Sequence, residues 1–245
     1  MEQKSLGVIG GMGPKATSVF FEKVINNTDA NSDQEHINMV ILNHATMPDR
    51  TKAILTNNHE EFLQVIEKDI RLLEVAGVAN IAIPCNTSHY FFDKMQEMTN
   101  IPIINMVEET AKQIRSSFGE GSKVGILATT GTIETGLYHK ACEKYGLVPF
   151  SPGVEMQQKV MEIIYEDVKG QNNLDPTKLE GLIQRLLLEE GCQAIILACT
   201  ELSCITINQD LAKSCVDALD VLVEKSIERS GKRLKREKTL LSSFK

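Results

Sequence analysis

Two cysteines occupy matching places in the chain, each at the end of a short apolar run that is typical of a buried strand. Cys85 follows the run 81–83, and Cys199 follows the run 194–198. In parallel α/β sheets, ligands bind at the carboxyl ends of the strands. Two thiols that faced each other across such a site could remove a proton from one face of a carbon and return one to the other face.

The residues beside the two cysteines favour reactive thiols over structural ones. Either cysteine alone would be better explained as a core residue, because free cysteine is among the most buried residue types. Both are followed by polar side chains, however, namely Asn86-Thr87 and Thr200-Glu201. A helix beginning beside each sulfur would lower the pKa of the thiol by about one unit at most. Two thiolates in one small cleft would repel each other, so we expect one thiolate and one thiol.

Internal similarity predicts two related domains. Residues 6–13 can be laid over 124–131, and residues 72–87 over 186–201. Each half thus opens with a glycine-containing turn after a strand and later offers a strand that ends in cysteine. We expect a first domain at 1–106, completed by a C-terminal helix at about 208–228, and a second domain at 107–207. A basic tail covers 229–245.

Alternation of apolar runs with segments of helical period predicts an α/β fold with parallel sheets. The expected strands are 6–9, 39–42, 81–83, 101–104, 124–127 and 194–198. The expected helices are 15–28, 58–76, 88–98, 107–118, 133–145, 153–168, 176–190 and 217–229. We therefore predict two Rossmann-like domains related by a pseudo-twofold axis, with the active site in the cleft between them.

Composition and charge exclude several classes of protein. The 245 residues are 42% hydrophobic and 24% charged, as in ordinary globular proteins, and no apolar run is long enough to span a membrane. The net charge of −7 argues against nucleic acid as the main partner, although 229–245 holds seven Lys and Arg against one Glu. Six cysteines without metal-ligand spacing are expected to be free thiols in a cytoplasmic protein with no metal.

Five motifs, in order along the chain, resemble those of the aspartate/glutamate racemase family, on its aspartate racemase branch. They are Gly10-Gly11-Met12-Gly13-Pro14, His44-Ala45-Thr46-Met47-Pro48-Asp49-Arg50-Thr51, Pro84-Cys85-Asn86-Thr87-Ser88-His89, Ala128-Thr129-Thr130-Gly131-Thr132 and Ala198-Cys199-Thr200-Glu201. The similarity runs from residue 6 to about 225. It implies a racemase of an acidic amino acid, aspartate or glutamate, that uses neither pyridoxal phosphate nor any other cofactor and forms a homodimer.

The resemblance also implies roles for individual residues. Cys85 and Cys199 would be the paired catalytic thiols. Arg50 and Lys169 would bind the side-chain carboxylate of the substrate. The substrate's remaining polar groups would be held by Met12, Gly13, Asn86, Thr87, Thr129, Thr130, Thr132, Thr200 and Glu201. Glu201, in place of the histidine of the glutamate racemase branch, favours aspartate over glutamate.

Other functions fit parts of the same pattern. Gly11, Gly13 and Ala16 match a dinucleotide fingerprint, but the second strand ends without the acidic residue that such a site needs, so an NAD-dependent enzyme is disfavoured. Other cysteine-based isomerases, hydantoin racemases or decarboxylases of the same superfamily, and a racemase of broad specificity, stay open. A non-catalytic amino-acid binding protein would leave both thiols passive.

Overall fold

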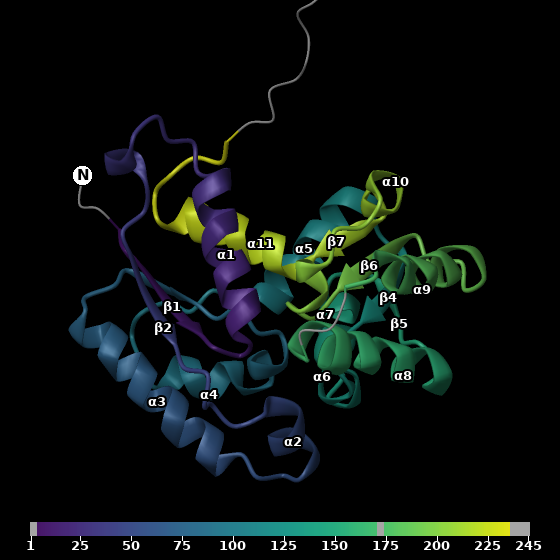
Figure 1. Ribbon diagram of the computed structural model, residues 1–245, viewed down its shortest axis with the longest axis horizontal. Helices are drawn as coiled ribbons and strands as arrows, with labels where there is room; N and C mark the ends of the chain where they lie inside the picture. Colours follow the sequence, from purple (N-terminus) through teal and green to yellow (C-terminus); the bar gives the residue numbers. More distant parts are fainter. Residues whose placement is uncertain (1–3, 171–173, 236–245) are drawn as a thin grey trace, which may run out of the picture.

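The computed structural model describes residues 4–170 and 174–235, which form two parallel-sheet α/β lobes (Figure 1). Most of the basic tail, 236–245, lies outside the described residues. Within the described part of the chain, no helix is long and apolar enough to cross a membrane.

The sheet of the first lobe has three parallel strands in the order β2-β1-β3. They are β1 (Leu6–Gly10), β2 (Met39–Asn43) and β3 (Asn80–Ala82). All residues of β1 and β3 are buried, as expected for short apolar runs that are covered on both faces. The helices of this lobe are α1 (Pro14–Asn27), α2 (Arg50–Leu55), α3 (Glu60–Val75) and α4 (Phe92–Glu97), with 3-10 turns at Asp33–Glu35 and Thr87–Phe91.

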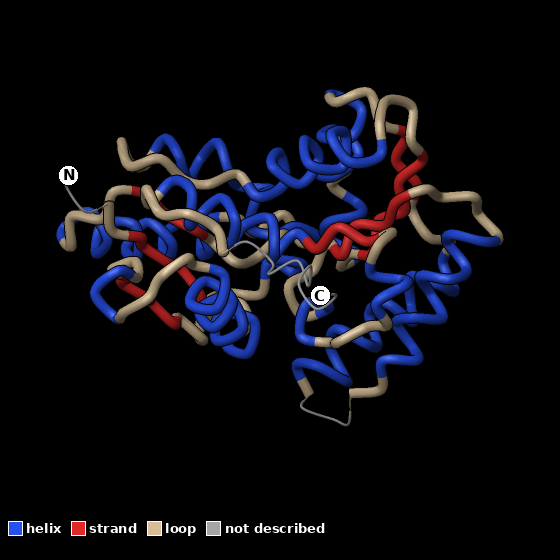
Figure 2. The backbone as a smooth tube through the Cα atoms, turned by 90° about the horizontal axis from the view of Figure 1, so that it is seen from above, coloured by secondary structure: helices blue, strands red, loops and turns tan. Residues whose placement is uncertain are grey.

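The second lobe holds a four-stranded parallel sheet in the order β5-β4-β6-β7. Its strands are β4 (Lys123–Leu127), β5 (Val148–Phe150), β6 (Ala194–Leu197) and β7 (Cys215–Asp217). Its helices are α6 (Thr130–Glu134), α7 (Leu137–Lys144), α8 (Val154–Glu162), the π-helix Ile163–Lys169, α9 (Pro176–Leu188), the 3-10 turn Leu202–Cys204 and α10 (Gln209–Ala212). The two groups of strands are well separated when the molecule is viewed from above (Figure 2).

Two helices, α5 (Met106–Phe118) and α11 (Ala218–Arg229), lie between the sheets and join the lobes (Figure 1). Apolar residues of both helices pack in one cluster with β1 of the first sheet and with β4 and β6 of the second. We call this cluster the central core. Helix α11 also packs against α1 of the first lobe.

The structure differs from the sequence-based expectations in several elements. The expected strand 101–104 is extended chain that makes one bridge, between Ile103 and Ile81. Strands β5 and β7 and the short helix α2 were not predicted. β7 falls inside the segment 208–228, which was expected to be a helix of the first lobe, yet it forms the edge of the second sheet. The expected helices 88–98, 133–145 and 153–168 are each divided into two helical segments.

Candidate active site

Four loops, each at the carboxyl end of a strand, meet between the lobes. Gly11–Gly13 follows β1, and 83–87 follows β3, while 128–129 follows β4 and 198–201 follows β6. These strands lie side by side within their sheets, so their loops emerge at the same edge. The first loop requires glycine at Gly11, where φ is +88° and a Cβ atom would lie 2.3 Å from the backbone of His44.

A small buried cavity, which we call the inner pocket, contains both cysteines. The volume that the centre of a water molecule could occupy inside it is only about 10 Å³, and each cysteine is 5% exposed. The lobes therefore enclose the two thiols and leave almost no free space. Its lining residues are Met12, Asp49, Arg50, Thr51, Cys85, Asn86, Thr87, Thr129, Tyr165, Lys169, Cys199, Thr200 and Glu201.

A larger cavity of about 650 Å³, the outer pocket, adjoins the inner one. Four residues line both cavities, namely Asp49, Arg50, Lys169 and Glu201. The glycine turn of the first lobe and the end of the π-helix form much of its remaining wall. A small molecule bound between the two thiols could thus extend past these four charged side chains into the outer pocket.

Cys199 is held as a thiol by a buried carboxylate. Its Sγ donates a hydrogen bond of 3.0 Å to Oε2 of Glu201, which is itself 4% exposed. Burial raises the pKa of Cys199 well above its ordinary value, and the negative charge of Glu201 raises it further. The expectation of a lowered pKa is therefore wrong for this thiol: the backbone N–H of Glu201 at the start of the 3-10 turn does lower the pKa, but burial and the carboxylate of Glu201 outweigh it.

Cys85 has a cation beside it instead. The buried guanidinium of Arg50 interacts with its sulfur; burial lowers the pKa of Arg50, but the charges of Cys85 and Asp49 outweigh this effect and raise it. The backbone carbonyl of Cys85 accepts hydrogen bonds from Ser88 Oγ at 2.7 Å and from His89 Nδ1 at 2.9 Å. Burial lowers the pKa of His89, so its neutral ring positions the Cys85 loop. The two sulfurs thus have neighbours of opposite charge.

Arg50 begins α2 and is held mainly by backbone carbonyls. Its terminal nitrogens donate to Pro48 O at 2.8 Å, Met47 O at 3.3 Å and Met12 O at 3.4 Å. Its Nε is buried without a hydrogen-bond partner in the part of the chain that the structure describes. The guanidinium is therefore fixed in place and keeps a free donor.

Lys169 approaches the same site from the second lobe. Its Nζ lies 3.9 Å from Glu201 Oε1 and 4.0 Å from the ring centre of Tyr165. Burial lowers the pKa of Lys169, but the charges of Glu201, Tyr165 and Cys199 together outweigh it and the net shift is upward. Tyr165 in turn donates a hydrogen bond of 3.2 Å to Asp49, so the π-helix touches the start of α2 across the two lobes.

Three threonine hydroxyls from the two lobes form a triangle beside the cysteines. Thr87 Oγ1 lies 3.0 Å from both Thr129 Oγ1 and Thr132 Oγ1, and the last two are 3.1 Å apart. Thr129 also caps α6 by accepting from the backbone N–H of Thr132. These hydroxyls satisfy one another within the protein and could turn to an anion that entered between them.

Most of the residues singled out by sequence come together here, with few exceptions. Thr130 lines a separate surface groove with Gln157 and Met161, and its backbone N–H points to the Met161 sulfur. Gly13 faces the outer pocket, where a Cβ atom would lie 3.3 Å from Glu201 Oε1.

Sequence reasoning missed Asp49, Thr51 and Tyr165 as pocket residues. Asp49 and Thr51 lie inside the second of the matched motifs, whereas Tyr165 lies outside all five, in the same helical segment as Lys169. Asp49 carries a further signal, since its side chain caps α2 by accepting from the backbone N–H of Lys52 at 2.8 Å.

Comparison with known proteins agrees with this geometry. The profile of the Asp/Glu/hydantoin racemase family matches residues 9–225. The chain belongs to this family. As a member of it, the protein is an amino-acid racemase, an isomerase.

Individual relatives support the assignment over nearly the whole chain. The broad specificity amino-acid racemase RacX of Bacillus subtilis is 32% identical over 206 residues, which cover 82% of this chain and 86% of RacX. The structure of Picrophilus torridus aspartate racemase has a TM-score of 0.80 at 31% identity and covers 95% of this chain and 96% of its own. An aspartate racemase homologue from Pyrococcus horikoshii has a TM-score of 0.75 at 26% identity, covering 93% and 99%.

Proposed function

We propose that this racemase interconverts L- and D-aspartate through a thiolate and a thiol that act on opposite faces of Cα. The observation that carries the proposal is the single closed pocket that contains Cys85 and Cys199, one from each lobe. A buried cation, Arg50, interacts with Cys85, whereas burial and the charge of Glu201 raise the pKa of Cys199. We therefore assign the role of base to Cys85 and the role of acid to Cys199.

The proton balance of the reaction follows from these roles. The Cys85 thiolate takes the Cα proton and becomes a thiol, which leaves a carbanion in the pocket. Cys199 then donates its proton to the opposite face of Cα and becomes a thiolate. The enantiomer formed in this way is the substrate for the reverse step, in which the two sulfurs exchange roles.

Stabilisation of the carbanion must come from fixed donors and from exclusion of water. The threonine triangle and the amide of Asn86 lie in or beside the inner pocket and can hold the α-carboxylate. The near absence of free space in that pocket supports a site that closes around its substrate.

Arg50 and Lys169 support an acidic substrate. Both line the inner and the outer pocket, and the free Nε of Arg50 is available to a side-chain carboxylate. A second candidate function, racemisation of a wider set of amino acids including glutamate, is favoured by the 650 Å³ outer pocket, which offers space for longer side chains. The name of the RacX relative points the same way. Action in the cytoplasm as a homodimer stays a prediction.

Solvent exchange tests the reaction directly. L-aspartate incubated with the enzyme in D₂O without added cofactor should yield D-aspartate that carries deuterium at Cα. Cys85→Ala and Cys199→Ala should each lower the rate by about a hundredfold to ten-thousandfold, which is the usual contribution of a general acid or base. Cys215→Ala, which removes a thiol on β7 outside the pocket, is the matched control. Full racemisation by either single pocket variant would contradict the two-base mechanism.

Replacement of Arg50 by leucine tests the choice of substrate. Arg50→Leu should reduce kcat/KM for aspartate far more than for alanine, because only aspartate loses the pairing of its side-chain carboxylate. The ratio of kcat/KM for aspartate to kcat/KM for alanine cancels any effect of the substitution on Cys85, because that effect applies to both substrates. An unchanged ratio would favour the racemase of broad specificity over the aspartate racemase.

A further inference from the structure

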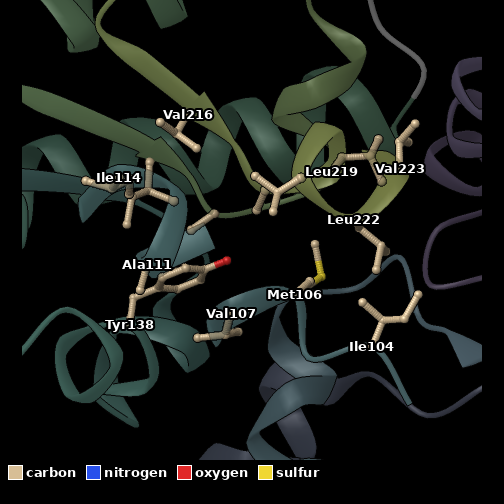
Figure 3. Close-up of a cluster of buried hydrophobic side chains, with 14 of the residues drawn as sticks. Ile104, Met106, Val107, Ala111, Ile114, Tyr138, Val216, Leu219, Leu222 and Val223 are labelled. Atoms are coloured by element: carbon tan, nitrogen blue, oxygen red, sulfur yellow. The ribbon is translucent and has the colours of Figure 1, made fainter. Parts of the chain in front are cut away.

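A buried phenol in the central core reaches the candidate site from the second lobe. Tyr138, on α7, is fully buried among apolar side chains of α5 and α11 (Figure 3). The close-up shows its ring near Ala111 and Val107, with the hydroxyl oxygen directed away from its own helix. Neither the motifs nor the mechanism above uses this residue.

The phenol donates its proton to the residue that follows Cys85. Tyr138 Oη lies 2.5 Å from Oδ1 of Asn86, which belongs to the loop after β3 in the other lobe. Burial raises the pKa of Tyr138 above its ordinary value, so the hydroxyl keeps the proton that it donates. A phenol that donates selects the oxygen of the amide and not its nitrogen.

The other end of this amide is buried and free. Asn86 is 2% exposed, and its Nδ2 has no hydrogen-bond partner among the described residues. The side chain lines the inner pocket together with both cysteines. A buried N–H₂ group without a partner is unfavourable, and it is expected where a ligand supplies the acceptor.

We propose that Tyr138 is a positioning residue that sets the orientation of the Asn86 amide, so that Nδ2 points to an oxygen of the substrate carboxylate. The inference rests on the proposed function, because it takes the substrate to be an amino acid held between the two thiols. It adds a contact between the lobes that depends on closure, since Tyr138 belongs to one lobe and Asn86 to the other.

Tyr138→Phe tests the inference, because it removes the hydroxyl and keeps the ring in the core. The variant should raise KM for L-aspartate about tenfold, the size of one lost hydrogen bond, with a smaller change in kcat. Tyr145→Phe is the matched control, since it removes a phenol that donates to Glu108 outside the pocket. That control should leave both constants unchanged.

A double-mutant cycle separates positioning from packing. Asn86→Ala should raise KM at least as much as Tyr138→Phe does, and the double variant should be no worse than Asn86→Ala alone. If the wild-type enzyme racemises aspartate, two results would overturn the inference while the proposed function stands. One is an unchanged KM in Tyr138→Phe, and the other is additive effects of the two substitutions. A wild-type protein without Cα exchange on any amino acid would overturn the proposed function and the inference with it.

Discussion

At the scale of residues, the site is unsymmetrical although the two halves of the chain are similar. Cys85 and Cys199 follow corresponding strands, yet one sulfur lies beside a guanidinium and the other donates to a carboxylate. If two thiols in one pocket had identical surroundings, only the repulsion between their charges would limit the pocket to one thiolate. Here the two sulfurs have different charged neighbours, and burial together with the charge of Glu201 raises the pKa of Cys199.

Glu201→Gln should make Cys199 more reactive. Removal of the carboxylate charge takes away one of the causes that raise the pKa of this thiol, so the thiolate should form at lower pH. Alkylation of Cys199 by iodoacetamide, followed by mass spectrometry across a pH series, should be about tenfold faster near neutral pH than in wild type. Glu190→Gln, which changes an acidic residue outside both pockets, is the control. An alkylation profile of Glu201→Gln that moved to higher pH would contradict the assigned role of Glu201.

The site residues that can be located from the sequence are those that come just after a predicted strand. Cys85, Asn86 and Cys199 directly follow buried runs, and the carboxyl ends of parallel strands share one edge of a sheet. Tyr138 and Asp49 reach the site from helices instead, so their contribution depends on how the lobes pack. A single sequence gives the spacing along the chain but not the contact between Tyr138 and Asn86, which lie 52 residues apart.

At the scale of elements, the sequence predicts segments that have a clear apolar run or helical period, and it misses short segments that lack one. Helix α3 has a clear apolar face and was predicted over nearly its observed length. Strands β5 and β7 are as short as β3, but β5 contains a proline and β7 ends at an aspartate, so neither has the apolar run that predicts β3. The π-helix Ile163–Lys169 was expected as plain α-helix, because no local pattern distinguishes the two. That segment carries both Tyr165 and Lys169.

The turn after β1 should tolerate no side chain at Gly11. Its φ of +88° is unfavourable for other residues, and a Cβ atom would lie 2.3–2.5 Å from three backbone atoms of His44. Gly11→Ala should therefore lower the free energy of unfolding by at least about 2 kcal/mol, measured by urea denaturation. Gly181→Ala is the control, because a Cβ atom at this position within α9 meets nothing within 4 Å. That change should raise stability by about 0.5–1 kcal/mol.

At the scale of the whole molecule, function depends on how closely the lobes approach each other. The hydrogen bond between Tyr165 and Asp49, the threonine triangle and the bond between Tyr138 and Asn86 all cross from one lobe to the other. The inner pocket leaves only about 10 Å³ for the centre of a water molecule, so we expect the lobes to separate when an amino acid enters. The central core packs α5 and α11 against both sheets.

A wedge between the lobes should therefore open the site and weaken catalysis. Gly131 on α6 packs directly against α2, and a Cβ atom there would lie 3.0 Å from Thr51 Cα. Because that neighbour is backbone, Gly131→Val can be accommodated only if α2 and α6 move apart. We expect kcat/KM for aspartate to fall at least about tenfold, since small displacements of reacting groups are costly. The buried thiols should at the same time become more accessible, so alkylation of Cys85 and Cys199 should be faster than in wild type.

These opposite changes distinguish opening of the lobes from general damage to the fold. Glu134→Val, which places the same side chain on the exposed face of α6, should leave both rates unchanged. Gly131→Ala should give a smaller effect of the same kind, because one methyl group requires a displacement of only a few tenths of an ångström. Wild-type kcat/KM together with unchanged alkylation in Gly131→Val would mean that contact between α2 and α6 does not govern closure, and that the two thiols reach their substrate by another movement of the lobes.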